Sequence, residues 1–214
     1  MKTFPMLVLT ACGGCLNLLL FSGRRDVEMR KKPEITATET LARTRLFHVE
    51  QLDLRFSNGV TTRYERLGRT GGNGAVLVVP MRSNDEVLLI REYAAGVDRY
   101  ELALPKGRIE PDESALDAAN RELQEETGYG ARRLRHLAGL TVAPGYMGHV
   151  TQIILAEDLY ESRLSGDEPE EIEVVPWPLS DLAGLLACED CTEARSIAAL
   201  FMARELLNGA SQEI

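Results

Sequence analysis

The sequence predicts one domain of the α/β or α+β class, in which a sheet is covered by helices. Short apolar segments with strand character are interleaved with two or three helical segments along the chain, and such a mixture packs as helices on a sheet. A length of 214 residues suits one domain with a substantial core. With 44% hydrophobic and 27% charged residues, the composition is that of an ordinary globular protein.

The first 28 residues differ from the rest of the chain, because residues 4–21 form an apolar run. Three interpretations compete. The run is a signal peptide or lipoprotein signal, since Leu9–Cys12 resembles a lipobox; it is a marginal membrane anchor; or it is an upstream extension from a misassigned start codon, with Met29 as the true first residue. We favour the third interpretation and leave residues 1–28 out of the fold prediction.

The charges around this run argue against secretion. Lys2 precedes it, whereas Arg24, Arg25 and three further basic residues at positions 30–32 follow it. By the positive-inside rule, even an inserted segment keeps the following domain in the cytoplasm. We therefore expect a cytoplasmic domain that makes no membrane contact.

Four cysteines form two Cys-x-x-Cys pairs, Cys12/Cys15 and Cys188/Cys191. Together they could hold zinc, but 172 residues lie between the pairs, far beyond the usual ligand spacing. Reduced thiols without a metal role are the expected state.

The amino-terminal part of the remainder reads as an arm followed by a hairpin. Residues 29–44 are polar and extended in character. Leu46–Phe56 alternates between apolar and polar residues, the turn signal Ser57–Gly59 follows, and Val60–Arg66 returns as the partner strand. Gly68–Gly74 is a glycine-rich loop.

Further strands are expected at Ala75–Pro80, Val87–Arg91, Leu134–Val142 and Val150–Ala156, because these short apolar runs are bounded by polar turns. Towards the carboxyl end, the acidic loop Gly166–Glu173 leads into a last strand. After this loop we expect a strand at Glu173–Pro176, followed by helices at Ser180–Leu186 and Thr192–Leu207.

Ser114–Thr127 has the signals of a capped helix. The residues from Asp112 or Glu113 to Ser114 supply the capping region, Gly128 ends the helix, and Leu116, Ala119 and Leu123 recur on one face. We expect this apolar stripe to pack against the sheet, which leaves the opposite, acidic edge facing a cleft.

The acidic edge of this helix consists of Glu122, Glu125 and Glu126. Residues three and four apart lie on one face of a helix, so the three carboxylates repel one another. Taken alone, such a run is a solvated helix face. The alternative is a site for a hard, oxygen-seeking cation, Mg²⁺ or Mn²⁺. Arg121 adds one positive charge that can orient a glutamate.

The net charge of −9 argues against a nucleic-acid surface, because phosphate backbones are held chiefly by clustered Lys and Arg. An acidic protein that binds a phosphorylated compound requires cations between the two, and divalent metal ions fill that role.

Residues 107–129 match a known pattern, Gly-x5-Glu-x7-Arg-Glu-U-x-Glu-Glu-x-Gly-U, in which U is a bulky apolar residue. The match includes every fixed position: Gly107, Glu113, Arg121, Glu122, Glu125, Glu126 and Gly128. By this motif the chain resembles the Nudix hydrolases. The resemblance implies a Nudix fold over residues 45–210, an α/β/α sandwich with a mixed sheet and the motif helix.

Other segments narrow the resemblance within this family. Val87–Tyr93 and Tyr100–Gly107 resemble the ADP-ribose diphosphatase branch. Pro144 is typical of ADP-ribose enzymes and Tyr146 of dinucleoside polyphosphate enzymes. From Thr40 to Leu207 the whole pattern is similar to ADP compounds hydrolases of the NudE type.

This resemblance implies metal-dependent hydrolysis of the diphosphate linkage of ADP-ribose, diadenosine polyphosphates and NADH, with release of AMP. A strict ADP-ribose diphosphatase is the alternative, and a non-catalytic nucleotide-binding regulator is a second one. The resemblance also implies small nucleotide substrates and a homodimer whose amino-terminal strands complete the site.

Residue roles follow from the same resemblance. The metal ligands are expected to be Glu122 and Glu126, then Glu125 and the backbone carbonyl of Lys106, while Arg121 pairs with Glu113 or Glu125. Gly107 and Gly128 are structural.

Four residues outside the motif are candidates for substrate contact, namely Arg91, Tyr93, Pro144 and Tyr146. Arg91 could clamp a phosphate or be a surface residue at a strand end. Tyr93 and Tyr146 could stack on adenine or pack at the rim of the core.

The base that activates water is expected outside the motif, because a carboxylate bound to metal is a poor base. By resemblance it lies in the acidic loop, at Glu170 first and Glu168 second, with Glu125 as the next candidate. The alternative for this loop is a solvated acidic turn.

Overall fold

The computed structural model describes residues 30–68, 74–166 and 169–210. The elements in chain order are β1 (Glu34–Arg43), β2 (His48–Arg55), β3 (Thr61–Leu67), β4 (Ala75–Pro80), β5 (Glu86–Ala94), β6 (Arg99–Ala103), β7 (Lys106–Arg108), α1 (Ala115–Thr127), β8 (Tyr129–Thr141), β9 (Val150–Glu161), β10 (Glu173–Pro178), a 3-10 turn η1 (Leu179–Asp181), α2 (Leu182–Leu186) and α3 (Ala194–Ala210).

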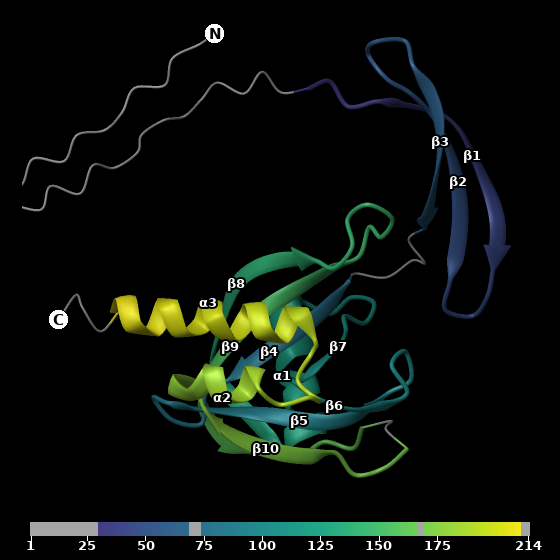
Figure 1. Cartoon of the computed structure of the whole chain (residues 1–214). Coiled ribbons are helices and arrows are strands. Elements are labelled where there is room, and N and C mark those ends of the chain that lie inside the picture. The colour runs from purple at the N-terminus through teal and green to yellow at the C-terminus, as the bar shows by residue number, and fades with distance from the viewer. Residues whose placement is uncertain (1–29, 69–73, 167–168, 211–214) are drawn as a thin grey trace, which may run out of the picture.

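A four-stranded mixed sheet forms the centre of the molecule, in the order β7-β4-β9-β8. Strands β4 and β9 are parallel and the other pairs are antiparallel. Side chains alternate across β4, so Val76 and Val78 face the cluster under α1 and Leu77 and Val79 face the cluster under α3. Helices α1 and α3 therefore cover opposite faces of this sheet (Figure 1), which confirms the predicted α/β sandwich with a mixed sheet.

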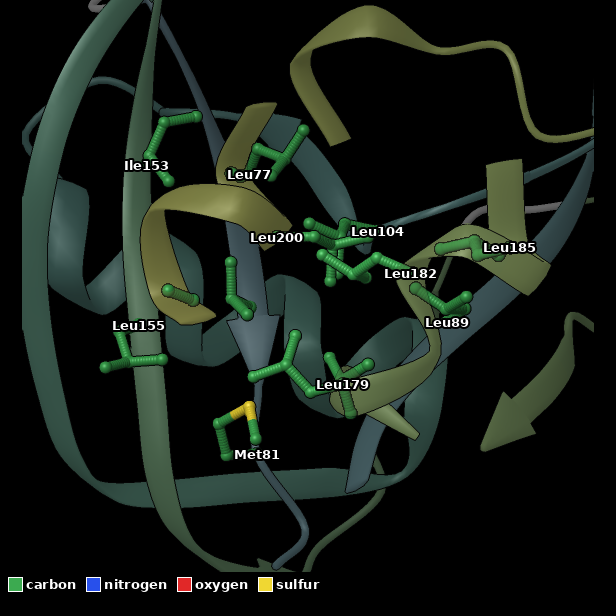
Figure 2. Packing of buried hydrophobic residues seen from close by; sticks show 14 of the residues in the cluster. Leu77, Met81, Leu89, Leu104, Ile153, Leu155, Leu179, Leu182, Leu185 and Leu200 are labelled. Carbon is green, nitrogen blue, oxygen red and sulfur yellow. The ribbon is translucent and has the colours of Figure 1, made fainter. Parts of the chain in front are cut away.

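The larger core lies between this sheet, strands β5 and β6, and helices α2 and α3. Figure 2 shows its side chains converging from these elements. Its fully buried large residues are Leu77, Leu89, Leu102, Leu104, Ile153, Leu155, Leu182 and Leu185. At about 1.5–3 kcal/mol for each buried leucine or isoleucine, this cluster is the main source of stability.

A second sheet has the order β10-β5-β6 and is antiparallel throughout. The sequence reading missed β6 and β7, since both are short and carry charged residues whose partners are distant in the chain. It also ended β5 and β9 too early and began β8 five residues too late.

The amino-terminal strands β1, β2 and β3 form a separate antiparallel sheet. The predicted hairpin around Asn58 and Gly59 is confirmed, with Gly59 at a positive φ of 83°. The polar arm at 29–44 contains β1, whose ten residues are all exposed. Figure 1 shows this sheet standing beside the central one.

One backbone contact ties the end of this sheet to the rest of the protein. The amide of Leu67, the last residue of β3, donates to the carbonyl of Tyr146 at 2.8 Å. The predicted glycine-rich loop that follows β3 lies mostly outside the described residues, at 69–73.

Helix α1 has the predicted caps. The Ser114 hydroxyl accepts from the amide of Asp117 at 3.2 Å, and Gly128 ends the helix in the left-handed conformation with φ 78°. The predicted apolar face was partly wrong. Ala119 and Leu123 are buried, but Leu116 is 39% exposed because the buried stripe turns towards Ala118 instead.

The amino-terminal extension and the pair Cys12/Cys15 lie outside the described residues. Cys188 and Cys191 are free thiols, and burial raises the pKa of Cys191 to about 11. No helix in the described part of the chain is long and apolar enough to cross a membrane.

Candidate active site

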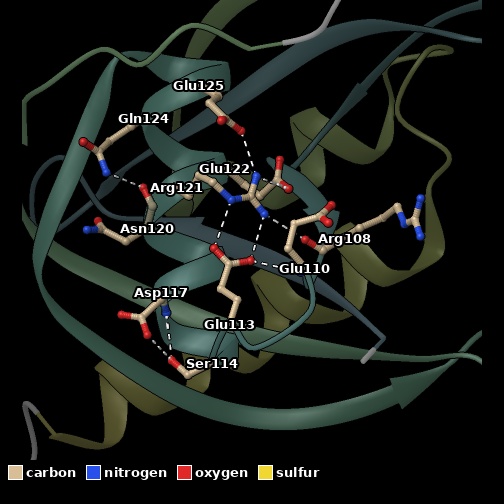
Figure 3. A network of polar contacts seen from close by, with 10 residues as sticks. All are labelled: Arg108, Glu110, Glu113, Ser114, Asp117, Asn120, Arg121, Glu122, Gln124 and Glu125. Atoms are coloured by element: carbon tan, nitrogen blue, oxygen red, sulfur yellow. Dashed lines mark hydrogen bonds and ion pairs between the residues drawn. The ribbon is translucent and has the colours of Figure 1, made fainter. Parts of the chain in front are cut away.

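Arg121 organises the charged edge of α1 (Figure 3). Its guanidinium donates to both oxygens of Glu113 at 3.0 Å, to Glu122 at 2.8 Å and to Glu125 at 2.9 Å. It also donates to the backbone carbonyl of Arg108 at 2.9 Å. The sequence left Glu113 and Glu125 as alternative partners of Arg121, and the structure pairs it with both.

Glu113 is fixed between α1 and the loop before it. Besides the two bonds from Arg121, its carboxylate accepts from the amide of Glu110 at 3.1 Å. The hydrogen bonds from Arg121 hold the pKa of Glu113 below its ordinary value. Glu113 is therefore an anionic partner that fixes the position of Arg121.

Gly107 lets β7 approach α1 closely. A side chain at this position would overlap the carboxylate of Glu122, so a larger residue would displace that carboxylate from its place. One residue earlier, the amide of Lys106 donates to Glu126 Oε2 at 2.8 Å. The motif glycine and its neighbour thus bring β7 against two of the three predicted ligands.

Glu126 is 3% exposed, and burial raises its pKa to about 8. The positive charge and the backbone amide of Lys106 offset only part of this effect. Without a further positive charge beside it, a large share of Glu126 is protonated at neutral pH. A divalent cation supplies that charge, and carboxylate oxygens are the ligands that Mg²⁺ and Mn²⁺ prefer. The residues present therefore fit such an ion.

The three glutamates do not yet converge on one point. Within the described ranges, no three His, Cys, Asp or Glu side chains are arranged as a metal site. The reason is visible in Figure 3, where Glu122 and Glu125 both turn towards Arg121.

Glu92 on β5 is a residue of this site that the sequence reading missed. Its Oε2 accepts from Lys106 Nζ at 3.0 Å, and its charge acts on Glu126. Nothing in the local sequence marks Glu92, because its link to the motif depends on how the β5 and β7 segments fold together.

The guanidinium of Arg91 is bonded to carboxylates of the protein itself. Its guanidinium donates to Glu173 at 2.9 Å and to Asp190 at 3.1 Å, so it joins β5 to β10 and to the connection between α2 and α3. Arg91 therefore lies within β5, which continues to Ala94, and its partly buried guanidinium is paired with two carboxylates. Its role as a phosphate clamp stays a prediction.

The acidic loop is held by an aromatic pair on β5 and β6. Glu170 Oε1 accepts from the Tyr100 hydroxyl at 2.6 Å. Tyr100 meets Tyr93 edge-on, with ring centroids 5.7 Å apart, and the Tyr93 hydroxyl donates to Asp98 at 2.6 Å. Tyr93 therefore supports Tyr100, which the sequence reading did not single out. Glu168 lies outside the described residues.

Pro144 and Tyr146 lie on the loop between β8 and β9, and both are exposed. The backbone of Tyr146 accepts from Leu67, as described above, while its side chain is 57% exposed. The structure thus places this loop where the amino-terminal sheet meets the domain.

Comparison with known families gives two matches. The model described as the NudE-type Nudix hydrolase N-terminal domain matches residues 33–66, which include most of β1–β3. The model of the NUDIX domain matches residues 73–200.

Two characterised relatives are similar over most of their length. The chain is 50% identical over 179 residues to ADP compounds hydrolase NudE of Escherichia coli (strain K12), covering 84% of this chain and 95% of that protein. It is 27% identical over 169 residues to an ADP-ribose pyrophosphatase of Bacillus subtilis (strain 168), covering 76% and 90%.

A solved structure agrees with these matches. The crystal structure of an ADP compounds hydrolase superposes with a TM-score of 0.79 at 49% identity, covering 85% of this chain and 97% of the other. With the complete motif running from β7 through α1 and both family models matched in order, the chain belongs to the Nudix hydrolase family.

Proposed function

We propose that this enzyme hydrolyses the diphosphate linkage of ADP-containing compounds, namely ADP-ribose, diadenosine polyphosphates and NADH, and releases AMP. The observation that carries the proposal is the complete carboxylate set on α1, fixed by Arg121 on one side and by Lys106 of β7 on the other. The names of the relatives, an ADP compounds hydrolase and an ADP-ribose pyrophosphatase, support the substrate class.

The metal, Mg²⁺ or Mn²⁺, would be held by Glu122, Glu125, Glu126 and the backbone carbonyl of Lys106. When bound it supplies positive charge that neutralises the diphosphate and the charge that develops during hydrolysis. Arg121 then has the task of keeping Glu122 and Glu125 close together, and Glu113 keeps Arg121 in place.

A substrate panel tests this proposal. ADP-ribose, NADH, diadenosine triphosphate and GDP-mannose are compared by kcat/KM with one preparation and saturating Mg²⁺. Comparable rates for the three adenine compounds support the proposal, whereas hydrolysis of ADP-ribose alone supports the strict ADP-ribose diphosphatase. An enzyme that binds but cleaves none of the four compounds contradicts the proposal and supports the non-catalytic regulator.

The base that activates water is proposed to be Glu170, then Glu168, with Glu125 as the third candidate. Glu170 has an orienting partner, since Tyr100 donates to one of its two oxygens. The variants Glu170→Gln and Glu168→Gln, singly and together, are measured across pH with ADP-ribose. The variant that removes the base loses kcat with little change in KM. A double variant with the rate and pH profile of the wild type would transfer the role to Glu125.

We further propose that the enzyme is a cytoplasmic homodimer, in which the sheet β1–β3 of one protomer reaches the other. The full exposure of β1 and the short link from Leu67 to Tyr146 support this arrangement. Light scattering at several protein concentrations measures the oligomeric state, and a monomer at all concentrations contradicts the dimer.

The division of the chain into an extension at 1–28, an arm at 29–44 and a domain at 45–210 is likewise a proposal.

A further inference from the structure

Arg121 on α1, Arg91 on β5 and Lys106 on β7 are cations that could meet an anionic substrate, and both arginines already donate to protein acceptors. Arg121 gives its donors to Glu113, Glu122 and Glu125 and to a backbone carbonyl. Arg91 gives its donors to Glu173 and Asp190. Both guanidinium groups therefore fix the protein, and a substrate phosphate would have to displace short ion pairs to reach them.

Lys106 differs from both arginines because its charged group is accessible to solvent beside its one acidic partner. Its Nζ donates to Glu92 Oε2 at 3.0 Å, and an ammonium has three donors. The Lys106 side chain is 27% exposed and that of Glu92 is 40% exposed, so the pair opens to solvent. Its own backbone amide meanwhile contacts Glu126 at 2.8 Å. The charge is thus anchored beside a predicted metal ligand but remains accessible.

Lys106 is the single lysine between positions 33 and 214. Lysines occur at positions 2, 31, 32 and 106, and every other Lys or Arg from 33 to 214 is an arginine. A lysine ammonium binds phosphate as a compact point charge on a flexible stem, whereas arginine binds in a fixed fork. In a chain of net charge −9, a cation beside the carboxylates also attracts a dianionic substrate.

We propose that the ammonium of Lys106 binds the diphosphate of the substrate and that Glu92 orients it. This inference rests on the proposed function. It assigns the side chain of Lys106 a role separate from that of its backbone carbonyl, which remains a proposed metal ligand whatever the side chain is.

Kinetics of Lys106→Met with ADP-ribose test the contact. Loss of a charge-assisted bond made in both the bound substrate and the transition state raises KM, by about tenfold to a hundredfold, with little change in kcat. Lys106→Arg retains the charge and recovers most of the loss. Arg133→Met, on the exposed edge strand β8, is the matched control for removing one cation, and its KM stays at the wild-type value.

A double variant separates direct binding from a local charge effect. In Lys106→Met, the carboxylate of Glu92 loses its cationic partner and could itself repel the substrate. Lys106→Met/Glu92→Gln removes that repulsion. If the double variant still has the raised KM, Lys106 binds the substrate directly; a return to the wild-type KM overturns the proposal, because Lys106 then only neutralises Glu92.

A chemical readout independent of activity completes the test. Lysines of the full chain are reductively methylated with formaldehyde and a borane reductant, and modification at each position is followed by mass spectrometry. The non-hydrolysable methylene analogue of ADP-ribose, with Mg²⁺, is expected to slow methylation at Lys106 and not at the exposed Lys31 and Lys32. Adenosine, which lacks phosphate, should protect none of them.

The outcomes distinguish this inference from the function on which it rests. An active wild type with an unchanged KM in Lys106→Met, or equal methylation of Lys106 with and without the analogue, overturns the inference alone. A wild type that hydrolyses no compound of the panel overturns the proposed function. The protection experiment still decides the Lys106 contact in that case, and it also decides the contact if Lys106→Met fails to fold.

Discussion

Glu126 shows how one residue can favour function over stability. It is almost fully buried and its pKa is raised to about 8, so its charge is costly in the absence of a cation. The amide of Lys106 needs only an oxygen acceptor at this position, which a glutamine also offers. The carboxylate charge is therefore required by the proposed metal and not by the fold.

We predict that Glu126→Gln and Glu122→Gln each lower kcat by several orders of magnitude at saturating Mg²⁺, because a metal ligand is lost. The free energy of unfolding of Glu126→Gln should equal or exceed that of the wild type. Both quantities are measured on the same preparations, with Asp117→Asn on the first turn of α1 as the control. Near-normal rates in both glutamine variants would contradict the assignment of the metal helix.

Gly107 allows a steric prediction. A Cβ at this position overlaps the Glu122 carboxylate, so Gly107→Ala displaces that carboxylate from its place beside Arg121. We expect a loss of roughly 1–3 kcal/mol in the free energy of unfolding and a higher Mg²⁺ concentration for half-maximal rate. Gly96→Ala is the matched control, since nothing lies within 4 Å of its added Cβ. Equal behaviour of the two variants would show that the close approach is unimportant.

For single residues, the sequence identified those of the motif but not all the residues that lie near them in space. Helix periodicity and the fixed spacing gave Glu122, Glu125 and Glu126, because their relation is local. Glu92 and Tyr100 could not be found in this way, since their partners lie 14 and 70 residues away along the chain. The role of Arg91 was left open for the same reason, because Asp190 is 99 residues away.

Helix α3 begins at a charged network that holds it against the sheet. The Glu193 carboxylate accepts from the amide of Ser196 at 2.7 Å and from Arg195 at 2.6 Å, and Arg195 donates to the buried hydroxyl of Thr151 on β9 at 2.9 Å. Burial works to raise the pKa of Glu193, but the hydrogen bonds from Arg195 and Ser196 outweigh it, so the pKa is lowered.

The lowered pKa gives a pH-dependent prediction. A carboxylate whose pKa is lower in the folded state stabilises the fold above its unfolded pKa of about 4.3, and this contribution is lost as the pH falls through the folded pKa. Glu193→Gln should therefore cost about 1 kcal/mol at pH 7, and the difference from the wild type should shrink below about pH 4. Chemical denaturation at several pH values measures it, with Glu205→Gln on the exposed side of α3 as the control. A difference that is constant with pH would contradict the role of the charge.

The elements themselves were predictable to different degrees. Helix α1 was recognised from Ser114, its periodicity and Gly128, all of which act within a few residues. Strands β6 and β7 were missed because their existence depends on pairing with β5 and β4, which are distant or separated from them by turns. The long strands β8 and β9 extend beyond their apolar centres because each pairs with the other over its whole length.

At the scale of the whole molecule, the extension at 1–28 is open to a direct test. A chain that begins at Met29 should be as stable and as active as the full chain if the extension is not part of the enzyme. Thermal unfolding and kcat/KM with ADP-ribose are compared for the two forms. Loss of folding on truncation would show that the apolar run belongs to the core.

The sheet β1–β3 has a consequence for the exchange of backbone amide protons with solvent. Among its described strand residues, Leu52 is buried while all of β1 is exposed, and a small sheet with so little apolar burial opens easily on its own. In dilute solution the amides of β1 should therefore take up deuterium far sooner than those of β4, whose residues from Val76 to Pro80 are buried. If a second protomer covers β1, raising the protein concentration slows uptake there and leaves β4 unchanged, so the exchange pattern itself reports the association.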